Sequence, residues 1–149
     1  MKFTSTVTIN IPKEKVAAYF ANPDYLKEYQ EGFLRKELIS GDSGEENTIS
    51  KLYYKQGKRE MELTETIQVN KLPDEFMAQY HHKFTDNTMK STFTALSETK
   101  TRYDAEIHYT AFRGFVVKTM VFIAPNFFKK QVAKWLKNFK VFVEKGVTS

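Results

Sequence analysis

Residues 127–146, FFKKQVAKWLKNFKVFVEKG, form a helical pattern with one continuous apolar side. At 100° per residue, the apolar side chains fall within an arc of roughly 120°. They are Phe128, Val132, Trp135, Leu136, Phe139, Phe142 and Val143. Lysines take most of the remaining circumference. Such a helix needs another layer of structure over its apolar side, and the rest of the chain has to supply that layer.

The preceding sequence reads as strands, with two short helices near its start. Residues 2–11, KFTSTVTINI, alternate between apolar and polar side chains and predict a half-buried strand. Pro12 then opens a helix over KEKVAAYFA, and Asn22-Pro23 opens a second short helix that runs to Tyr29. After Gly32, six strand-like stretches follow, separated by turn signals such as QGK. Consecutive strands on short loops form an antiparallel meander.

This order of elements predicts an α+β fold. A curved antiparallel sheet of about seven strands wraps around the long C-terminal helix, and two short helices lie between strands 1 and 2. The apolar arc, Trp135 included, is expected to lie against the inner face of the sheet, with the lysines in water. Pro125 either bends the last helix or separates a short segment, 115–123, from the main helix.

Length and composition narrow the classes of protein. A chain of 149 residues is most simply one domain, 1–149. The longest apolar run, FVVKTMVFIA, is too short to span a bilayer, and no signal peptide is evident at the N-terminus. Cytoplasm is therefore the default expectation. The chain has no Cys, and its three His lack the spacing of a zinc site, so we expect neither a metal nor a cofactor.

Two stretches resemble a known group of proteins. VTINIPKEKVAAYFANPDYLKEYQEGF is similar to the opening strand and two helices of the START-like/Bet v 1-like superfamily. FRGFVVKTMVFIAPNFFKKQVAKWLKNFKVFVEKG resembles its glycine-led C-terminal helix, and within the superfamily the chain looks like the SRPBCC polyketide cyclase/dehydrase-related family. The resemblance implies a helix-grip fold with a hydrophobic cavity between sheet and long helix, used elsewhere in the superfamily for lipids, quinones and polyketides.

Glu65 is the first candidate for chemistry. In REMELTETIQVN it falls on the same side as Leu63 and Ile67. A carboxylate that faces an apolar interior must be paired, hydrogen-bonded or protonated, and those are properties of a general acid or base or of an anchor for a polar ligand. The alternative places Glu65 at a cavity mouth, at an edge or on a bulge, where it meets water.

His82 is the second candidate. In FMAQYHHKF it shares a face with Phe76, Tyr80 and Phe84, so inward-pointing phenylalanines would bring it into the cavity. The alternative is an ordinary hydrogen-bonded histidine of the core. Together with Glu65, we nominate as cavity lining a set of mostly aromatic residues: Tyr80, His82, Phe93, Tyr109 and Trp135.

No full catalytic set stands out, so the leading hypothesis is a non-catalytic binder or carrier of a small hydrophobic molecule, such as a lipid, quinone or polyketide-like compound. The second is a cyclase or dehydratase in which Glu65 or His82 moves protons. The third is a protein-interaction or membrane-peripheral module.

The third hypothesis rests on charge. From Arg113 onward, eight basic residues face one acid, whereas the preceding part carries 15 basic and 17 acidic residues. The basic face of the last helix would contact an anionic membrane through Lys129, Lys130, Lys134, Lys137 and Lys140. The alternative is a solvated face opposite a core stripe. The basicity belongs to one helix, and we expect no nucleic-acid partner.

Overall fold

The computed structural model describes residues 1–146. β1 (Lys2–Ile9) is followed by α1 (Lys13–Ala21), the short 3-10 helix η1 (Pro23–Tyr25) and α2 (Leu26–Tyr29). Six strands come next, and they are β2 (Phe33–Ser40), β3 (Ile49–Gln56), β4 (Arg59–Lys71), β5 (Glu75–His81), β6 (Thr85–Ser97) and β7 (Lys100–Phe112). Two helices then follow, α3 (Phe115–Ile123) and α4 (Asn126–Lys145).

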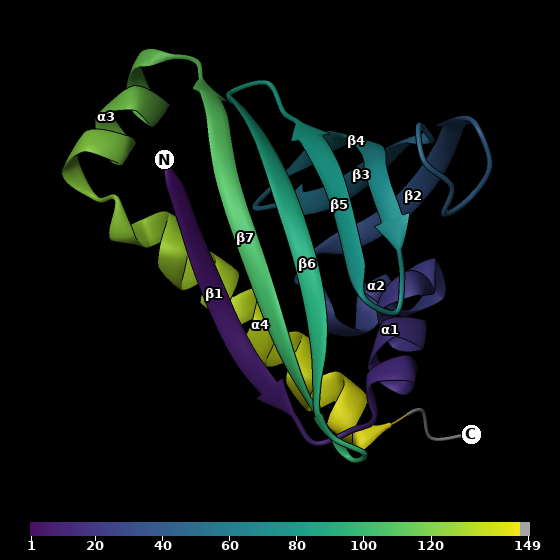
Figure 1. Ribbon diagram of the computed structural model, residues 1–149. Coiled ribbons are helices and arrows are strands. Elements are labelled where there is room, and N and C mark those ends of the chain that lie inside the picture. Colours follow the sequence, from purple (N-terminus) through teal and green to yellow (C-terminus); the bar gives the residue numbers. More distant parts are fainter. Residues whose placement is uncertain (147–149) are drawn as a thin grey trace.

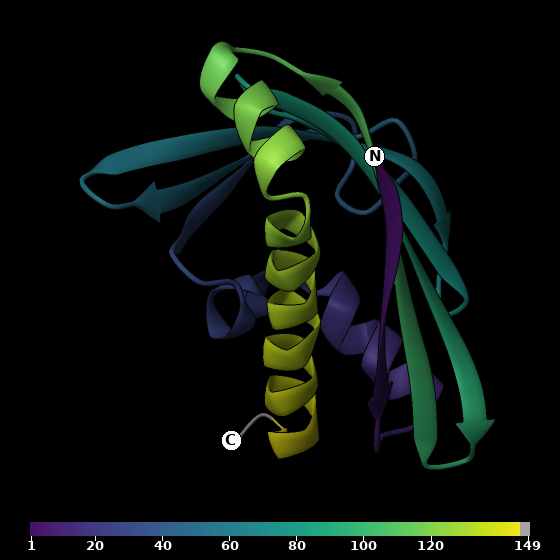
Figure 2. The ribbon, with the colours of Figure 1, turned by 90° about the vertical axis from the view of Figure 1, so that its left-hand side faces the viewer.

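The strands form one antiparallel sheet in the order β1-β7-β6-β5-β4-β3-β2. The first strand thus pairs with the last, while the others pair with their neighbours in sequence. Figure 1 shows the sheet curving from β1 and β7 round to β2, and Figure 2 shows α4 lying along its inner side. The predicted helix-grip fold, with about seven strands and two short helices after the first, is confirmed.

The core lies between α4 and the inner face of the sheet. Four residues of α4 are at most 3% exposed, and they are Val132, Leu136, Phe139 and Val143. Burying four such side chains stabilises the fold by about 8 kcal/mol before the entropy of ordering them is subtracted. Phe20 of α1 adds an aromatic ring between the layers, with its centroid 5.2 Å from that of Phe93 and 6.2 Å from that of Phe139. Aromatic rings therefore fill the space in which the sequence predicted a cavity.

Trp135 is a correction to the prediction from the helical pattern. It is 38% exposed, whereas the adjacent Leu136 is 3% exposed. On the helical wheel, the four buried residues of α4 centre roughly 70° away from Trp135, because α4 meets the sheet through one half of its apolar arc. Phe142 lies at the same outer side, but the rings of Tyr19, Tyr25 and Tyr29 cover it. Trp135 is therefore not hidden beneath the sheet.

The C-terminal helical segment is interrupted between α3 and α4. Residues 124 and 125 separate the two helices, as in the second of the two arrangements predicted from Pro125. Ala124 leaves the helical region, with φ −131° and ψ 61°. α3 buries none of its residues and lies to one side of the upper end of β7 (Figure 1).

Candidate functional site

A row of side chains crosses the inner face of the sheet from β2 to β7. Direct cross-strand pairs join its members, which are Leu38, Ser50, Glu65, Tyr80, Asn87 and Tyr109. Because directly opposite residues on neighbouring strands point to the same face, these side chains all point toward the helices. The middle of this row is polar. Another row of the same sheet, which joins Ile67, Ala78, Met89 and Ile107, is apolar.

Glu65 is the buried charge in this row. Glu65 is 6% exposed, and each of its two carboxylate oxygens has its own partner. Tyr80 Oη donates a hydrogen bond to Oε2 at 2.8 Å, and Lys36 Nζ lies 3.0 Å from Oε1. A buried carboxylate is tolerated when its charge is paired and its oxygens are hydrogen-bonded, and both conditions are met here. The strand alternation in β4 thus placed Glu65 on the correct face.

Three tyrosines surround the carboxylate. Burial, and after it the charge of Glu65, raises the pKa of the Tyr80 phenol well above its ordinary value. The same two causes raise the pKa of Tyr54, whose Oη donates to Gln30 Oε1 at 2.6 Å. Burial also raises the pKa of Tyr29. The nearby phenols and the charge of Glu65 raise it further. All three phenols therefore stay protonated at neutral pH and can act as hydrogen-bond donors.

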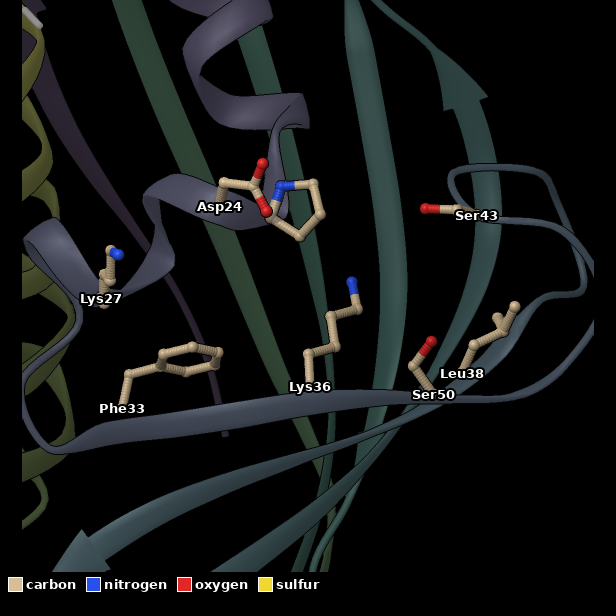
Figure 3. Close-up of a pocket in the computed structure, with 8 residues that line it drawn as sticks. Asp24, Lys27, Phe33, Lys36, Leu38, Ser43 and Ser50 are labelled. Atoms are coloured by element: carbon tan, nitrogen blue, oxygen red, sulfur yellow. The ribbon is translucent and has the colours of Figure 1, made fainter.

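A cavity of about 580 Å³ opens beside this group. It lies between the η1–α2 segment on one side and β2, β3 and their connecting loop on the other (Figure 3). Its lining residues are Pro23, Asp24, Lys27, Phe33, Lys36, Leu38, Ser43 and Ser50. Figure 3 shows Phe33 and Lys36 rising from β2 toward η1–α2, with Ser43 pointing in from the loop. The cavity thus has apolar walls, two lysines, two hydroxyls and the carboxylate of Asp24.

Lys36 connects the cavity to the buried carboxylate. Its side chain lines the cavity and is 27% exposed, while its ammonium is paired with Glu65. Ser50, another lining residue, stands directly opposite Glu65 across the β3–β4 pair. A polar group of a bound molecule would therefore contact Lys36, and Lys36 lies between that group and the buried Glu65.

None of the six predicted cavity residues lines this cavity, and Glu65 is connected to it only through Lys36. Phe93 is 2% exposed and packs against Tyr103, with ring centroids 4.7 Å apart, so it belongs to the closed core. Tyr109 packs between Phe112 and Phe128, with both centroid distances at 5.2 Å. Trp135 is on the outer side of α4. None of these three lines the cavity described above.

His82 lies just beyond the end of β5, at the rim of the sheet. Its Nδ1 accepts a hydrogen bond from the backbone N–H of Phe84 at 3.2 Å, within its own turn. Burial and then the charge of Arg113 lower the pKa of His82. Arg113 also donates to the carbonyl of His82. The ring of His82 is therefore used within the turn, and Glu65 and Tyr80 are brought together without it.

The sequence reasoning missed Lys36, Lys27, Phe33 and Ser50. Strict alternation in FLRKELIS puts Phe33 and Lys36 on opposite faces, but a register shift between Phe33 and Arg35 puts both on the inner face. A second shift follows Leu38. β-Bulges of this kind leave no mark in an alternation pattern. The one available signal was that an inward-pointing Glu65 needs a cation close to it.

No protein-family model and no curated protein sequence matches the chain. Solved structures do match it in shape. A conserved protein from Geobacillus kaustophilus has a TM-score of 0.79 and 13% identity over 97% of this chain and 96% of that one. Norcoclaurine synthase from Thalictrum flavum, in complex with dopamine and hydroxybenzaldehyde, has a TM-score of 0.70 and 11% identity over 100% and 89% of the two chains.

A third similar structure is the Zhui aromatase/cyclase from Streptomyces sp. R1128, with a TM-score of 0.67 and 12% identity over 99% of each chain. At such identities the likeness concerns the fold. The fold that the resemblance implies is confirmed: this chain has the Bet v 1-like helix-grip fold.

Proposed function

We propose that this protein binds a small amphipathic molecule in the cavity between η1–α2 and β2–β3. The observation that carries the proposal is the position of Lys36, which lines the cavity and is paired with a buried carboxylate. The cavity volume of about 580 Å³ lies within the range of small-molecule sites. Phe33, Leu38 and Pro23 would contact an apolar body, and Lys36 and Ser50 a carbonyl or carboxylate.

The ligand class follows from this lining. An uncharged hydrocarbon would make no use of the polar groups in the lining, while a highly charged ligand would make no use of its apolar walls. Lipids, quinones and polyketide-like compounds share an apolar body with an oxygen-bearing end. Two structures of the same fold are an aromatase/cyclase and a synthase holding aromatic molecules, which supports the same class.

The test uses 2-naphthoate as a probe with an apolar bicycle and one carboxylate. Titration into the ¹⁵N-labelled protein should shift the amide signals of Phe33, Lys36 and Ser50 in a saturable way. Lys36→Met should weaken binding about tenfold, because a hydrogen bond to a charged group is lost. Lys51→Met is the matched control, since Lys51 lies on β3 and pairs with Glu62 rather than lining the cavity. No saturable shift at β2 and β3, or equal effects of the two variants, would refute the proposal.

A second function, acid–base catalysis, rests on the buried carboxylate of Glu65, which contacts the cavity-lining Lys36. In this scheme Glu65 takes a proton from the carbon next to a ligand carbonyl, the carbonyl oxygen becomes an enolate, and Lys36 donates a hydrogen bond to that oxygen. Returning the proton to carbon completes the cycle, so no other reactant is needed. Cyclase or dehydratase chemistry starts from such an enolate.

Deuterium exchange at the benzylic carbon of phenylacetone measures this step directly by NMR in D₂O. The wild type should accelerate exchange at least about tenfold, and Glu65→Gln should remove the acceleration. His82→Asn should retain it, because the His82 ring bonds only within its turn. Equal rates for wild type and Glu65→Gln would exclude Glu65 as the base and leave the binding proposal untouched.

A further inference from the structure

α3 presents an apolar surface that the rest of the molecule leaves uncovered. Four of its side chains are 70–89% exposed: Phe115, Val116, Phe122 and Ile123. At 100° per residue they fall on one arc of roughly 120°. Val117, Met120 and Val121 are on the opposite side and are half-buried. α3 thus leans on the body with its less exposed side and turns its largest apolar residues outward.

This helix is held in place at its base. Arg113, the last residue but one before α3, donates two hydrogen bonds of 2.9 Å to the carboxylate of Asp86. It also donates to the carbonyl oxygens of His82 and Lys83. Gly114 then turns the chain with φ +89°, and a Cβ at this position would come within 3.3 Å of the Phe84 ring. The exposed residues therefore belong to a helix whose first turn is held in place by the hydrogen bonds of Arg113.

Two neighbours extend the surface. Phe84, in the turn between β5 and β6, is 39% exposed, and Phe127, at the start of α4, is 50% exposed. Lys83 Nζ lies 5.4 Å from the centroid of the Phe84 ring. We call the six residues Phe84, Phe115, Val116, Phe122, Ile123 and Phe127 the apolar tip. Large exposed apolar surfaces of this kind mark sites of contact with another body.

The charge around the apolar tip indicates what that body is. Residues 114–143 contain six lysines and no acid. Lys134 is paired with Glu31 at 2.7 Å and Lys140 with Glu144 at 2.9 Å. Lys118, Lys129 and Lys130 are exposed and form no ion pair among the residues that the structure describes. These three lie on α3 itself and in the first turn of α4, next to the apolar tip.

We propose that the apolar tip inserts into the surface of an anionic lipid bilayer, with Lys118, Lys129 and Lys130 at the level of the head groups. An amphipathic helix that combines exposed Phe and Ile with flanking lysines binds interfaces in this way, through apolar burial and attraction to anionic lipid. A second copy of this chain would bring the same lysines against one another. The contact therefore uses α3 and the start of α4, rather than the whole lysine face of α4.

Vesicle co-sedimentation tests the proposal with the full chain. Vesicles of phosphatidylcholine with about 30% phosphatidylglycerol should bind the protein, and phosphatidylcholine alone should bind it at least about tenfold more weakly. Phe122→Ser/Ile123→Ser should lower the partition coefficient about 100-fold. Since α3 buries no residue, this variant should keep the circular dichroism and unfolding midpoint of the wild type.

Two matched controls distinguish binding through the apolar tip from binding through any exposed apolar side chain or any lysine. Leu96→Ser/Val141→Ser removes apolar side chains that are 49% and 56% exposed, at the end of β6 and in the second half of α4, away from α3 (Figure 1). It should bind vesicles like the wild type. Lys129→Glu/Lys130→Glu should abolish the preference for anionic lipid, whereas Lys55→Glu/Lys58→Glu, in the β3–β4 hairpin, should retain it.

A single-tryptophan protein reports insertion itself. In Trp135→Phe/Phe122→Trp, the only indole is on α3, so anionic vesicles should shift its emission to the blue and brominated lipid should quench it. Absence of vesicle binding, binding unaffected by Phe122→Ser/Ile123→Ser, or an unquenched indole would each overturn the proposal. So would a wild-type dimer that becomes monomeric in Phe122→Ser/Ile123→Ser without vesicle binding, because a second copy would then cover the apolar tip.

Discussion

Lys36 and Glu65 differ in how easily each can return to water. The Glu65 side chain is 7% exposed and that of Lys36 is 27% exposed. Lys36→Met leaves a buried carboxylate without its cation, so we expect it to lower the free energy of unfolding by about 2–3 kcal/mol. Glu65→Gln keeps an acceptor for Tyr80 and frees Lys36 to move outward, so its cost should be about 1 kcal/mol.

Urea denaturation measures both values. Lys51→Met, which breaks the exposed Lys51–Glu62 pair, should change the stability little and sets the scale for a surface pair. If Lys36→Met cost no more than Lys51→Met, the pair would not be the buried junction between cavity and core described above.

Asp86 makes stability depend on pH in acid. The Arg113 guanidinium, through its hydrogen bonds, lowers the pKa of Asp86 from 3.8 to about 2. A carboxyl whose folded pKa is depressed contributes stability that is present above its unfolded pKa and is lost as the pH falls through the folded one. Wild type should therefore be more stable than Asp86→Asn at pH 5, and the difference should shrink between about pH 4 and pH 2.

Urea midpoints of both proteins over that range give the difference directly. In an Arg113→Met background the pH-dependent part of the difference should become smaller, because the main cause of the lowered pKa is gone and only the contact with His81 remains. A difference that stayed constant in the wild-type background would contradict the assignment.

At the scale of elements, Trp135 and Leu136 of α4 both belong to the apolar arc of the helical pattern but differ in burial. Leu136→Ala removes a side chain that is 3% exposed and should cost about 2–4 kcal/mol. Trp135→Ala removes one that is 38% exposed, and despite its larger size it should cost less than Leu136→Ala. Chemical denaturation followed by circular dichroism measures both, since Trp fluorescence is lost in one variant. The reverse order would mean that α4 meets the sheet through the other half of its apolar arc.

The elements themselves were predictable because their signals are local. The alternation in residues 2–11, the turn at QGK and the proline at 125 each mark a boundary by backbone chemistry alone. Glu65 was found for the same reason, since β4 keeps its alternation through that residue. Its role in binding or catalysis stays a proposal.

What was missed depends on contacts between elements. The register shifts in β2 turn Phe33 and Lys36 to the same face, and only the pairing with β3 sets them. The helical pattern of α4 gives the width of its apolar arc, but the tyrosines that cover Phe142 and leave Trp135 exposed come from α1, η1 and α2. Likewise, the apolar composition of FVVKTMVFI does not reveal that α3 buries none of its residues.

At the scale of the whole molecule, stability should be unevenly distributed. α4, β1 and β7 share the buried core, so their amides should exchange with solvent only on global unfolding. α3 contributes no buried residue, so its amides should exchange at least about 100-fold faster than those of the second half of α4. Hydrogen exchange read by mass spectrometry tests this. Equal protection of α3 and α4 would contradict the view that α3 is independent of the core.

The order of elements along the chain has a consequence for synthesis. All seven strands precede α4, and the residues of α4 close the core. Until residues 126–145 have been made, the strands lack the helix that covers the inner, apolar face of the sheet. Protection at that stage has to come from a chaperone or from delayed collapse, and the native packing can form only after translation has passed the final helix.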